Sequence, residues 1–177
     1  MNAVVQMAAP AGGEEMADEQ QQYLTFALGD EVFALGILNV KEILEFSGVT
    51  PIPMMPPVVA GGINLRGRVV PVVDLSVRFG RPPIVASRRT CVIIIEVGPA
   101  GAGQDVGVIV DAVHHVVEIP APEIEPLPAF GARLRADFIA GMARTDGRFM
   151  VILDAGRVLE IDELAEMVRE RAGEAAP

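Results

Sequence analysis

Three aspartates each end an apolar, strand-like run, and carboxylates brought together could hold a divalent cation or act as an acid–base pair. The runs are VVPVVD ending at Asp74, VGVIVD ending at Asp111 and FMVILD ending at Asp154. The alternative is structural, because an aspartate after a strand accepts hydrogen bonds from nearby backbone N–H groups. No nucleophile or further metal ligand accompanies the three carboxylates, so we expect structural roles.

Other residues with reactive side chains give weaker signals. The only histidines, His114 and His115, are consecutive, and consecutive strand residues point to opposite faces, so a shared metal ion is not expected. The single cysteine, Cys91, lies in the run TCVIIIEV and is expected to be a buried structural thiol. The segment GPAGAG at 98–103 lacks the Lys and Ser or Thr of a phosphate-binding loop. We therefore expect no catalytic centre and no cofactor.

Glu42 and Arg66 are the two charged residues that stand out in apolar surroundings. A half-buried arginine normally needs a carboxylate partner, so these residues are predicted to pair. The pair could be a structural lock between two elements, or both residues could face a partner protein. The two interpretations are compatible, and the residues alone do not choose between them.

The composition indicates a β-rich protein that is acidic at its ends. The 177 residues are 51% hydrophobic, with Val, Ile, Ala and Leu predominating and no Trp. The net charge is −10, and residues 1–22 and 160–177 each contribute −4. No apolar run approaches the roughly 20 residues of a membrane span, and the N-terminus has no signal-peptide pattern. No basic stripe with aromatics suggests nucleic acid binding, so we expect a cytoplasmic protein that binds no nucleic acid.

The elements that would position these residues are short strands separated by Gly and Pro. A hairpin is predicted from Tyr23–Leu28 to Val32–Leu35, followed by a short helical turn over 37–44 and a proline-rich extended connector over 51–57. Asp146-Gly147 predicts a second hairpin between 138–143 and 149–153. Further strands are predicted at 69–73, 91–97, 106–110 and 113–119. A helix is predicted over 159–173, with Arg169 and Arg171 near its end before Gly173.

One turn and the strand after it carry a resemblance to a known family. The segment GGINLRGRVVPVVDL at 61–75 contains Asn64, Leu65, Arg66 and Gly67, then an apolar strand closed by Asp74 and Leu75. This chain resembles the CheW family of chemotaxis coupling proteins, whose hallmark is an N-L-R-G turn followed by an apolar strand ending in Asp-Leu. The resemblance covers roughly residues 22–168.

The resemblance implies a mainly β fold of two small SH3-like five-stranded barrels, with a short helix and a C-terminal helix. We expect lobe one to comprise about 22–85 plus 146–168, and lobe two about 86–145. Residues 1–21 are expected to form a disordered acidic tail, and 169–177 a flexible C-terminus.

The resemblance also implies a non-catalytic scaffold that couples methyl-accepting chemoreceptors to the histidine kinase CheA, recruited from the cytoplasm to membrane-associated receptor arrays. The same scaffold could instead serve a chemosensory pathway that controls pili or gene expression. An enzyme using Asp74, Asp111 and Asp154 is the remaining alternative. The residues expected to bind protein partners are Val40, Glu42, Asn64, Leu65, Arg66, Gly67 and Val110.

Overall fold

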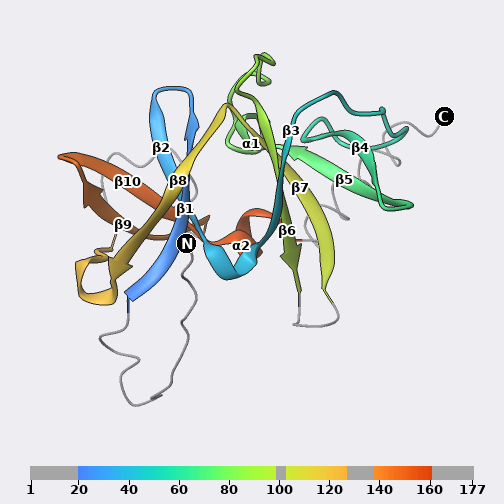
Figure 1. Cartoon of the computed structure of the whole chain (residues 1–177). Helices are drawn as coiled ribbons and strands as arrows, with labels where there is room; N and C mark the ends of the chain where they lie inside the picture. The colour runs from blue at the N-terminus through green and yellow to red at the C-terminus, as the bar shows by residue number, and fades with distance from the viewer. Residues whose placement is uncertain (1–19, 99–102, 127–137, 161–177) are drawn as a thin grey trace.

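The structure is a computed structural model that describes residues 20–98, 103–126 and 138–160, and these residues form ten strands with short helical turns (Figure 1). The predicted C-terminal helix lies outside the described residues from position 161 onward. The strands are β1 (Gln20–Leu28), β2 (Glu31–Gly36), β3 (Val40–Glu45), β4 (Val59–Leu65), β5 (Arg68–Asp74), β6 (Cys91–Val97), β7 (Gln104–Val110), β8 (Ala112–Pro120), β9 (Ile139–Thr145) and β10 (Arg148–Leu153). The helical turns are η3 (Ile37–Asn39), α1 (Leu75–Arg78), η4 (Ala121–Glu123) and α2 (Ala155–Val158).

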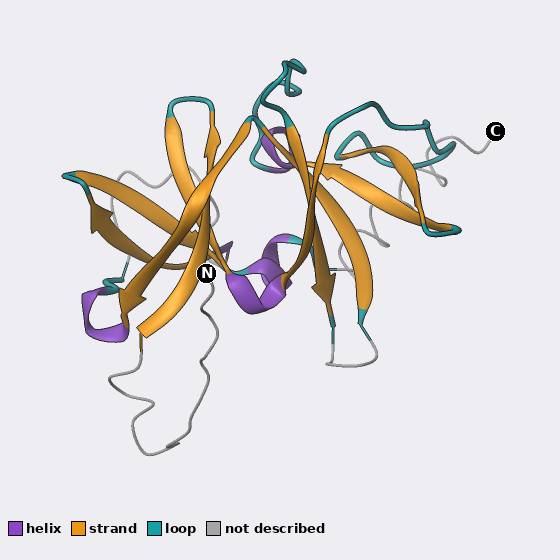
Figure 2. Ribbon diagram, viewed as in Figure 1, coloured by secondary structure: helices purple, strands orange, loops and turns teal. Residues whose placement is uncertain are grey.

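Two five-stranded sheets form two lobes side by side, with α2 between them (Figure 2). The first lobe has the strand order β8-β1-β2-β10-β9, and the second has the order β3-β6-β7-β5-β4. The mainly β fold of two five-stranded lobes is therefore confirmed. Among the described residues, no helix has the length and apolarity that crossing a membrane requires.

The division of the chain between the lobes differs from the expected boundaries. We expected residues 22–85 to share one lobe, but β3, β4 and β5 pair with β6 and β7 in the second lobe. We also placed 86–145 in lobe two, whereas β8 and β9 belong to the first lobe. The physical reason is long-range pairing: β5 lies parallel to β7, and β10 lies parallel to β2. Parallel partners require crossover connections, so some strands that lie far apart in the sequence are neighbours in a sheet.

The local predictions had mixed outcomes. Both predicted hairpins are present, as β1–β2 and as β9–β10 around Asp146-Gly147. The proline-rich connector contains no strand over 51–57. The helical turn predicted over 37–44 is wrong beyond Asn39, because β3 begins at Val40. Burial alternates with a period of two along β3, which is the pattern of a strand and not of a helix.

The two lobes repeat one strand plan in detail. In each lobe a hairpin, β1–β2 or β6–β7, is flanked by a strand parallel to its second member and by an antiparallel edge strand. Both edge strands carry a β-bulge at the same place. Val40 and Ile43 pair with Ile95 and Ile93, so that three steps along β3 match two along β6. Residues 113 and 116 pair with 26 and 24 in the same manner, so Val113-His114-His115-Val116 of β8 is equivalent to Val40-Lys41-Glu42-Ile43 of β3.

The largest apolar core lies between the lobes, and each lobe also has a smaller core of its own. Phe26, Phe33 and Leu35 of the first sheet pack with Ile93 and Ile95 of the second. Phe33 stacks against Phe26 at 6.0 Å between ring centroids and contacts Phe79 at 5.5 Å. Because most of the buried apolar residues belong to this shared core, neither lobe is expected to be stable without the other.

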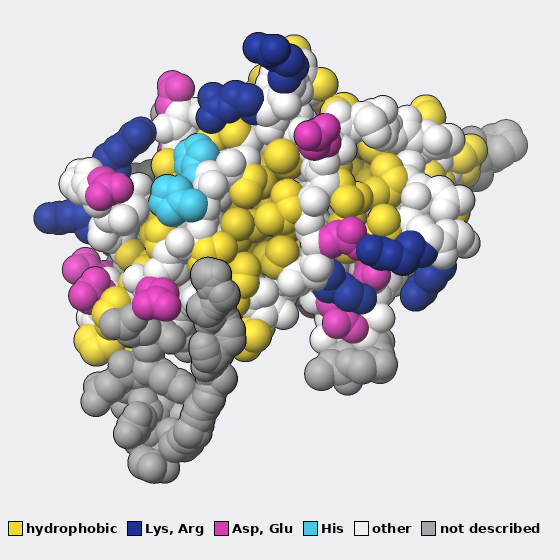
Figure 3. All heavy atoms as spheres, in the orientation of Figure 1, with side chains coloured by type: hydrophobic (Ala, Val, Ile, Leu, Met, Phe, Trp, Pro, Cys, Tyr) yellow, Lys and Arg dark blue, Asp and Glu magenta, His cyan; other side chains and the backbone are white. Residues whose placement is uncertain are grey.

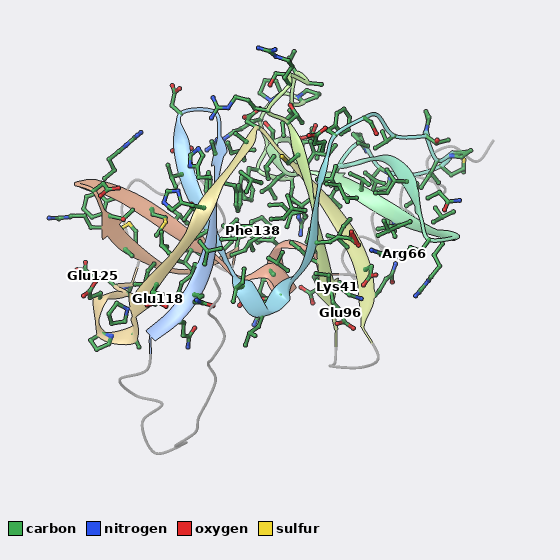
Figure 4. The ribbon with its side chains drawn as sticks, viewed as in Figure 1. Lys41, Arg66, Glu96, Glu118, Glu125 and Phe138 are labelled. Carbon is green, nitrogen blue, oxygen red and sulfur yellow. The ribbon has the colours of Figure 1, made fainter. Side chains whose placement is uncertain are left out.

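Polar contacts also fix the two lobes against each other. Arg78 of α1 donates a hydrogen bond from Nε to the Val158 carbonyl oxygen of α2 at 2.7 Å. Its guanidinium lies 4.7 Å from the ring centroid of Phe138, a buried residue that Figure 4 places between the two lobes. Arg81 forms an ion pair with Glu31 of β2. The surfaces of the two lobes therefore keep one relative orientation.

Candidate protein-binding surface

The three strand-end aspartates accept hydrogen bonds from backbone N–H groups, which is the structural role that we expected. Asp74 Oδ1 accepts hydrogen bonds from the Ser76 and Val77 N–H groups at 2.9 and 3.2 Å, and Oδ2 accepts one from Ile84 at 3.0 Å. Asp154 Oδ1 accepts a bond from the Arg157 N–H, and Asp111 Oδ2 accepts one from Gly29. The three carboxylates do not converge, and the described residues contain no group of three or more metal-ligating side chains.

The predicted pair of Glu42 and Arg66 is present on the surface of the second lobe. Arg66 Nη2 lies 2.6 Å from Glu42 Oε2, which ties the β4–β5 turn to the edge strand β3. The Arg66 side chain is 73% exposed, whereas the Glu42 side chain is 25% exposed. An exposed pair of this kind contributes only about 0–1 kcal/mol to stability. A contribution of this size to stability does not explain why the ion pair is present.

The turn that presents Arg66 has an unfavourable residue at its first position. Arg66 and Gly67 both have positive φ, 54° and 83°, which a two-residue hairpin turn of this type requires. Asn64 Oδ1 accepts a hydrogen bond from the Gly67 N–H at 2.9 Å and pins the turn. Asn, Asp or Gly is favoured where φ is positive, while a long side chain is disfavoured there. The equivalent turn of the first lobe has the favoured Asp146, also at φ 54°, before Gly147.

An apolar patch lies between the lobes on the face shown in Figure 3, bordered by β8 on one side and β3 on the other. We name this surface, which includes Val40, Ile43, Val113 and Val116, the interlobe patch. Val40 of β3 and Val113 of β8 pack partly buried against the shared core. Their neighbours Ile43 and Val116 are 43% and 46% exposed. Equivalent positions of the two edge strands thus build the two walls of one apolar surface.

His114 and His115 do not point to opposite faces, so the expectation drawn from strand alternation is wrong. The β-bulge puts both residues opposite Thr25, and their ring centroids are 6.4 Å apart with nearly parallel planes. Thr25 is buried; its hydroxyl donates to the His115 carbonyl oxygen at 2.8 Å and accepts from the His115 N–H at 3.3 Å. In Figure 3 the two imidazoles lie beside the apolar patch.

The structure separates the seven predicted protein-binding residues into groups. Glu42, Asn64, Leu65, Arg66 and Gly67 gather around the β4–β5 turn and its ion pair, and Figure 4 shows Arg66 on the outer side of the second lobe. Val40 belongs to the interlobe patch. Val110 is fully buried in the shared core, so it cannot touch a partner directly and its assignment is corrected.

Sequence reasoning missed Ile43, Val113 and Val116 as surface residues. Apolar residues in strands are normally assigned to a core, and only the bulges show that these side chains share the open side with Val40. A signal was present, since the V-x-x-I and V-x-x-V spacings recur in the two edge strands.

Comparisons with known proteins identify the family. A family model described as a CheW-like domain matches residues 22–163. The chemotaxis protein CheW of Klebsiella aerogenes is 33% identical over 161 residues, which cover 90% of this chain and 95% of that protein. The chemotaxis protein CheW of Rhizobium meliloti is 31% identical over 143 residues, covering 81% and 90%.

A solved structure gives the same result. The crystal structure of the scaffolding protein TtCheW from Thermoanaerobacter tengcongensis matches with a TM-score of 0.72 and 35% identity. The match covers 81% of this chain and 90% of that chain. This chain belongs to the CheW family of chemotaxis scaffold proteins.

Proposed function

We propose that this protein is a non-catalytic scaffold that couples methyl-accepting chemoreceptors to a CheA-type histidine kinase. Two surfaces support the proposal: the turn that carries Arg66, and the interlobe patch. They lie on different parts of the same rigid body, so one chain can hold two partners at once.

The kinase-binding surface is the β4–β5 turn with its ion pair. The observation that carries this assignment is Arg66 itself, an exposed arginine at a position of positive φ where Asn or Asp would be more stable. Arginine is enriched among the residues that dominate binding energy in protein interfaces. Glu42 orients the guanidinium, and the exposed Val69, which follows the turn on β5, adds apolar area beside it.

The receptor-binding surface is the interlobe patch. Its Val and Ile side chains form the two walls of one apolar surface, which fits the apolar face of a helix. The receptor would supply its cytoplasmic signalling tip, and the complex would gather the scaffold at the membrane-associated array. Flagellar control and control of pili or gene expression would use the same two surfaces.

Isothermal titration calorimetry with the cognate kinase regulatory domain and with a soluble receptor-tip fragment tests the proposal. The wild-type protein should bind each with micromolar affinity, about −8 kcal/mol. Arg66→Ala should weaken kinase binding by about 2 kcal/mol or more while the fold remains intact. Arg66→Lys should restore binding only in part, because an ammonium cannot reproduce the planar guanidinium fork.

Arg68→Ala is the matched control, since Arg68 is an exposed arginine two residues away and has no ion pair within the described residues. It should leave the kinase affinity nearly unchanged. Absence of binding heat for the wild-type protein with both partners would refute the scaffold function. Loss of stability without loss of affinity in Arg66→Ala would make Arg66 structural.

A further inference from the structure

We propose that His114 and His115 determine specificity at the interlobe patch by donating hydrogen bonds to carboxylate groups beside the apolar strip of the receptor helix. This inference rests on the proposed receptor-binding role of the patch. It assigns the histidine pair a function and gives Thr25 the role of positioning it.

The internal repeat of the fold provides the first step. His114 and His115 occupy the positions that Lys41 and Glu42 occupy in the second lobe. A bulge at this place is therefore a feature of the strand plan and is not special to the histidines. What differs between the lobes is the chemistry of the two side chains that the bulge presents.

The second step concerns hydrogen-bonding partners. In the second lobe both side chains are paired within the chain, Lys41 with Asp105 at 3.0 Å and Glu42 with Arg66 at 2.6 Å. In the first lobe the two imidazoles contact each other, and no ion pair or side-chain hydrogen bond to them occurs within the described residues. Their N–H groups are thus exposed donors at the border of an apolar surface, which is the arrangement of a polar interface rim.

The third step concerns the chemistry of the partner that binds this patch. Val113 and Val116 offer apolar contacts to a partner, and the two imidazoles beside them offer hydrogen-bond donors. Carboxylates are the strongest side-chain acceptors for an imidazole N–H group. The fitting partner is therefore an amphipathic receptor helix with Asp or Glu next to its apolar residues.

The position of the pair depends on Thr25. Its buried hydroxyl makes both hydrogen bonds that hold the His115 backbone in the bulge. Removing this hydroxyl should let the bulge relax, so that the imidazoles no longer lie together at the patch. Thr25→Val keeps the shape of the side chain but removes the hydroxyl, and Thr25→Ser retains it.

The test measures binding of the soluble receptor-tip fragment and of the kinase regulatory domain by calorimetry. The double variant His114→Ala/His115→Ala should weaken receptor binding about fivefold to tenfold and leave kinase binding unchanged. Thr25→Val should weaken receptor binding in the same direction, Thr25→Ser should not, and Thr25→Val added to the double alanine variant should have no further effect. Arg144→Ala, on the exposed β9–β10 hairpin, is the control and should bind as the wild type does.

Each outcome decides a separate point. Wild-type binding that persists in full in the double alanine variant overturns the role of the histidines, while the scaffold function stands. A loss of affinity in Thr25→Val that adds to the loss in the double variant overturns the positioning role of Thr25. If the wild-type protein binds no receptor fragment, the proposed function itself fails.

Discussion

Arg66 and Asp146 occupy the same position in equivalent hairpin turns, with the same φ of 54° and a glycine after each. The first lobe has the residue that the backbone favours, whereas the second lobe has a long cationic side chain there. The edge strands differ in a parallel way, with a paired Lys and Glu in one lobe and two imidazoles in the other. One strand plan thus supports two surfaces of different chemistry, because bulges and turns fix the backbone whatever side chains they carry.

The comparison treats the two lobes as parts of one cooperative unit. A substitution in the core that they share is the strongest test of that view. Phe33→Ala should lower the free energy of unfolding by about 3–5 kcal/mol, because Phe33 is buried against rings from both sides. Thermal unfolding should remain a single transition, followed by calorimetry and by far-ultraviolet circular dichroism. Phe149→Ala, at an exposed aromatic of the same lobe, is the control and should cost little. Two resolved transitions would show that the lobes are independent.

The capping aspartates offer a matched pair. Asp74 is buried and satisfies three N–H groups, while Asp154 is exposed and satisfies one. Asp74→Ala should therefore cost about 2–3 kcal/mol and Asp154→Ala about 0.5–1 kcal/mol, as measured by urea denaturation. Equal losses of unfolding free energy in the two variants would contradict the view that the burial of unsatisfied N–H donors determines the cost.

Exchanging the turn residues sharpens the comparison. Arg66→Asn should raise the free energy of unfolding by about 0.5–1 kcal/mol, because asparagine tolerates positive φ, and should weaken kinase binding by about 2 kcal/mol or more, as Arg66→Ala does. Asp146→Arg should lower stability by a similar amount. Urea denaturation with kinase titration on the same samples provides both readouts. A destabilised Arg66→Asn protein would mean that the ion pair contributes more than the turn strain costs.

The smallest expected effect comes from the one tyrosine. Burial raises the pKa of Tyr23, whose hydroxyl donates to Gln21 Oε1 at 3.0 Å. The neutral phenol is favoured in the folded state, so its contribution is complete below the unfolded pKa of about 10 and is lost as the pH rises through the folded pKa. The protein should lose some stability above about pH 10, and Tyr23→Phe should remove that loss. Urea midpoints compared at pH 8 and 11 measure the difference.

The features that could be predicted from sequence depend on residues close together in the chain. Asp146-Gly147 specifies its hairpin because only a few residue types accept positive φ, and the pairing of Glu42 with Arg66 followed from two charges in apolar segments. The membership of strands in the lobes could not be predicted in this way, because parallel pairing of β5 with β7 leaves no local signature. The histidine pair was misjudged because a bulge depends on the register between two strands.

The order of the strands along the chain affects how the protein can fold during synthesis. The second lobe is built from a continuous stretch, β3 to β7, whereas the first lobe combines β1 and β2 with β8 to β10. Contacts that complete the first lobe, such as Arg148 with Asp30, join residues 118 positions apart. A nascent chain leaves the ribosome N-terminus first. Strands β1 and β2 therefore emerge early, but they cannot complete their sheet until β8, β9 and β10 have been synthesised. We therefore expect β3 to β7 to pair first, and both lobes to become stable only when β8 to β10 complete the core that the lobes share.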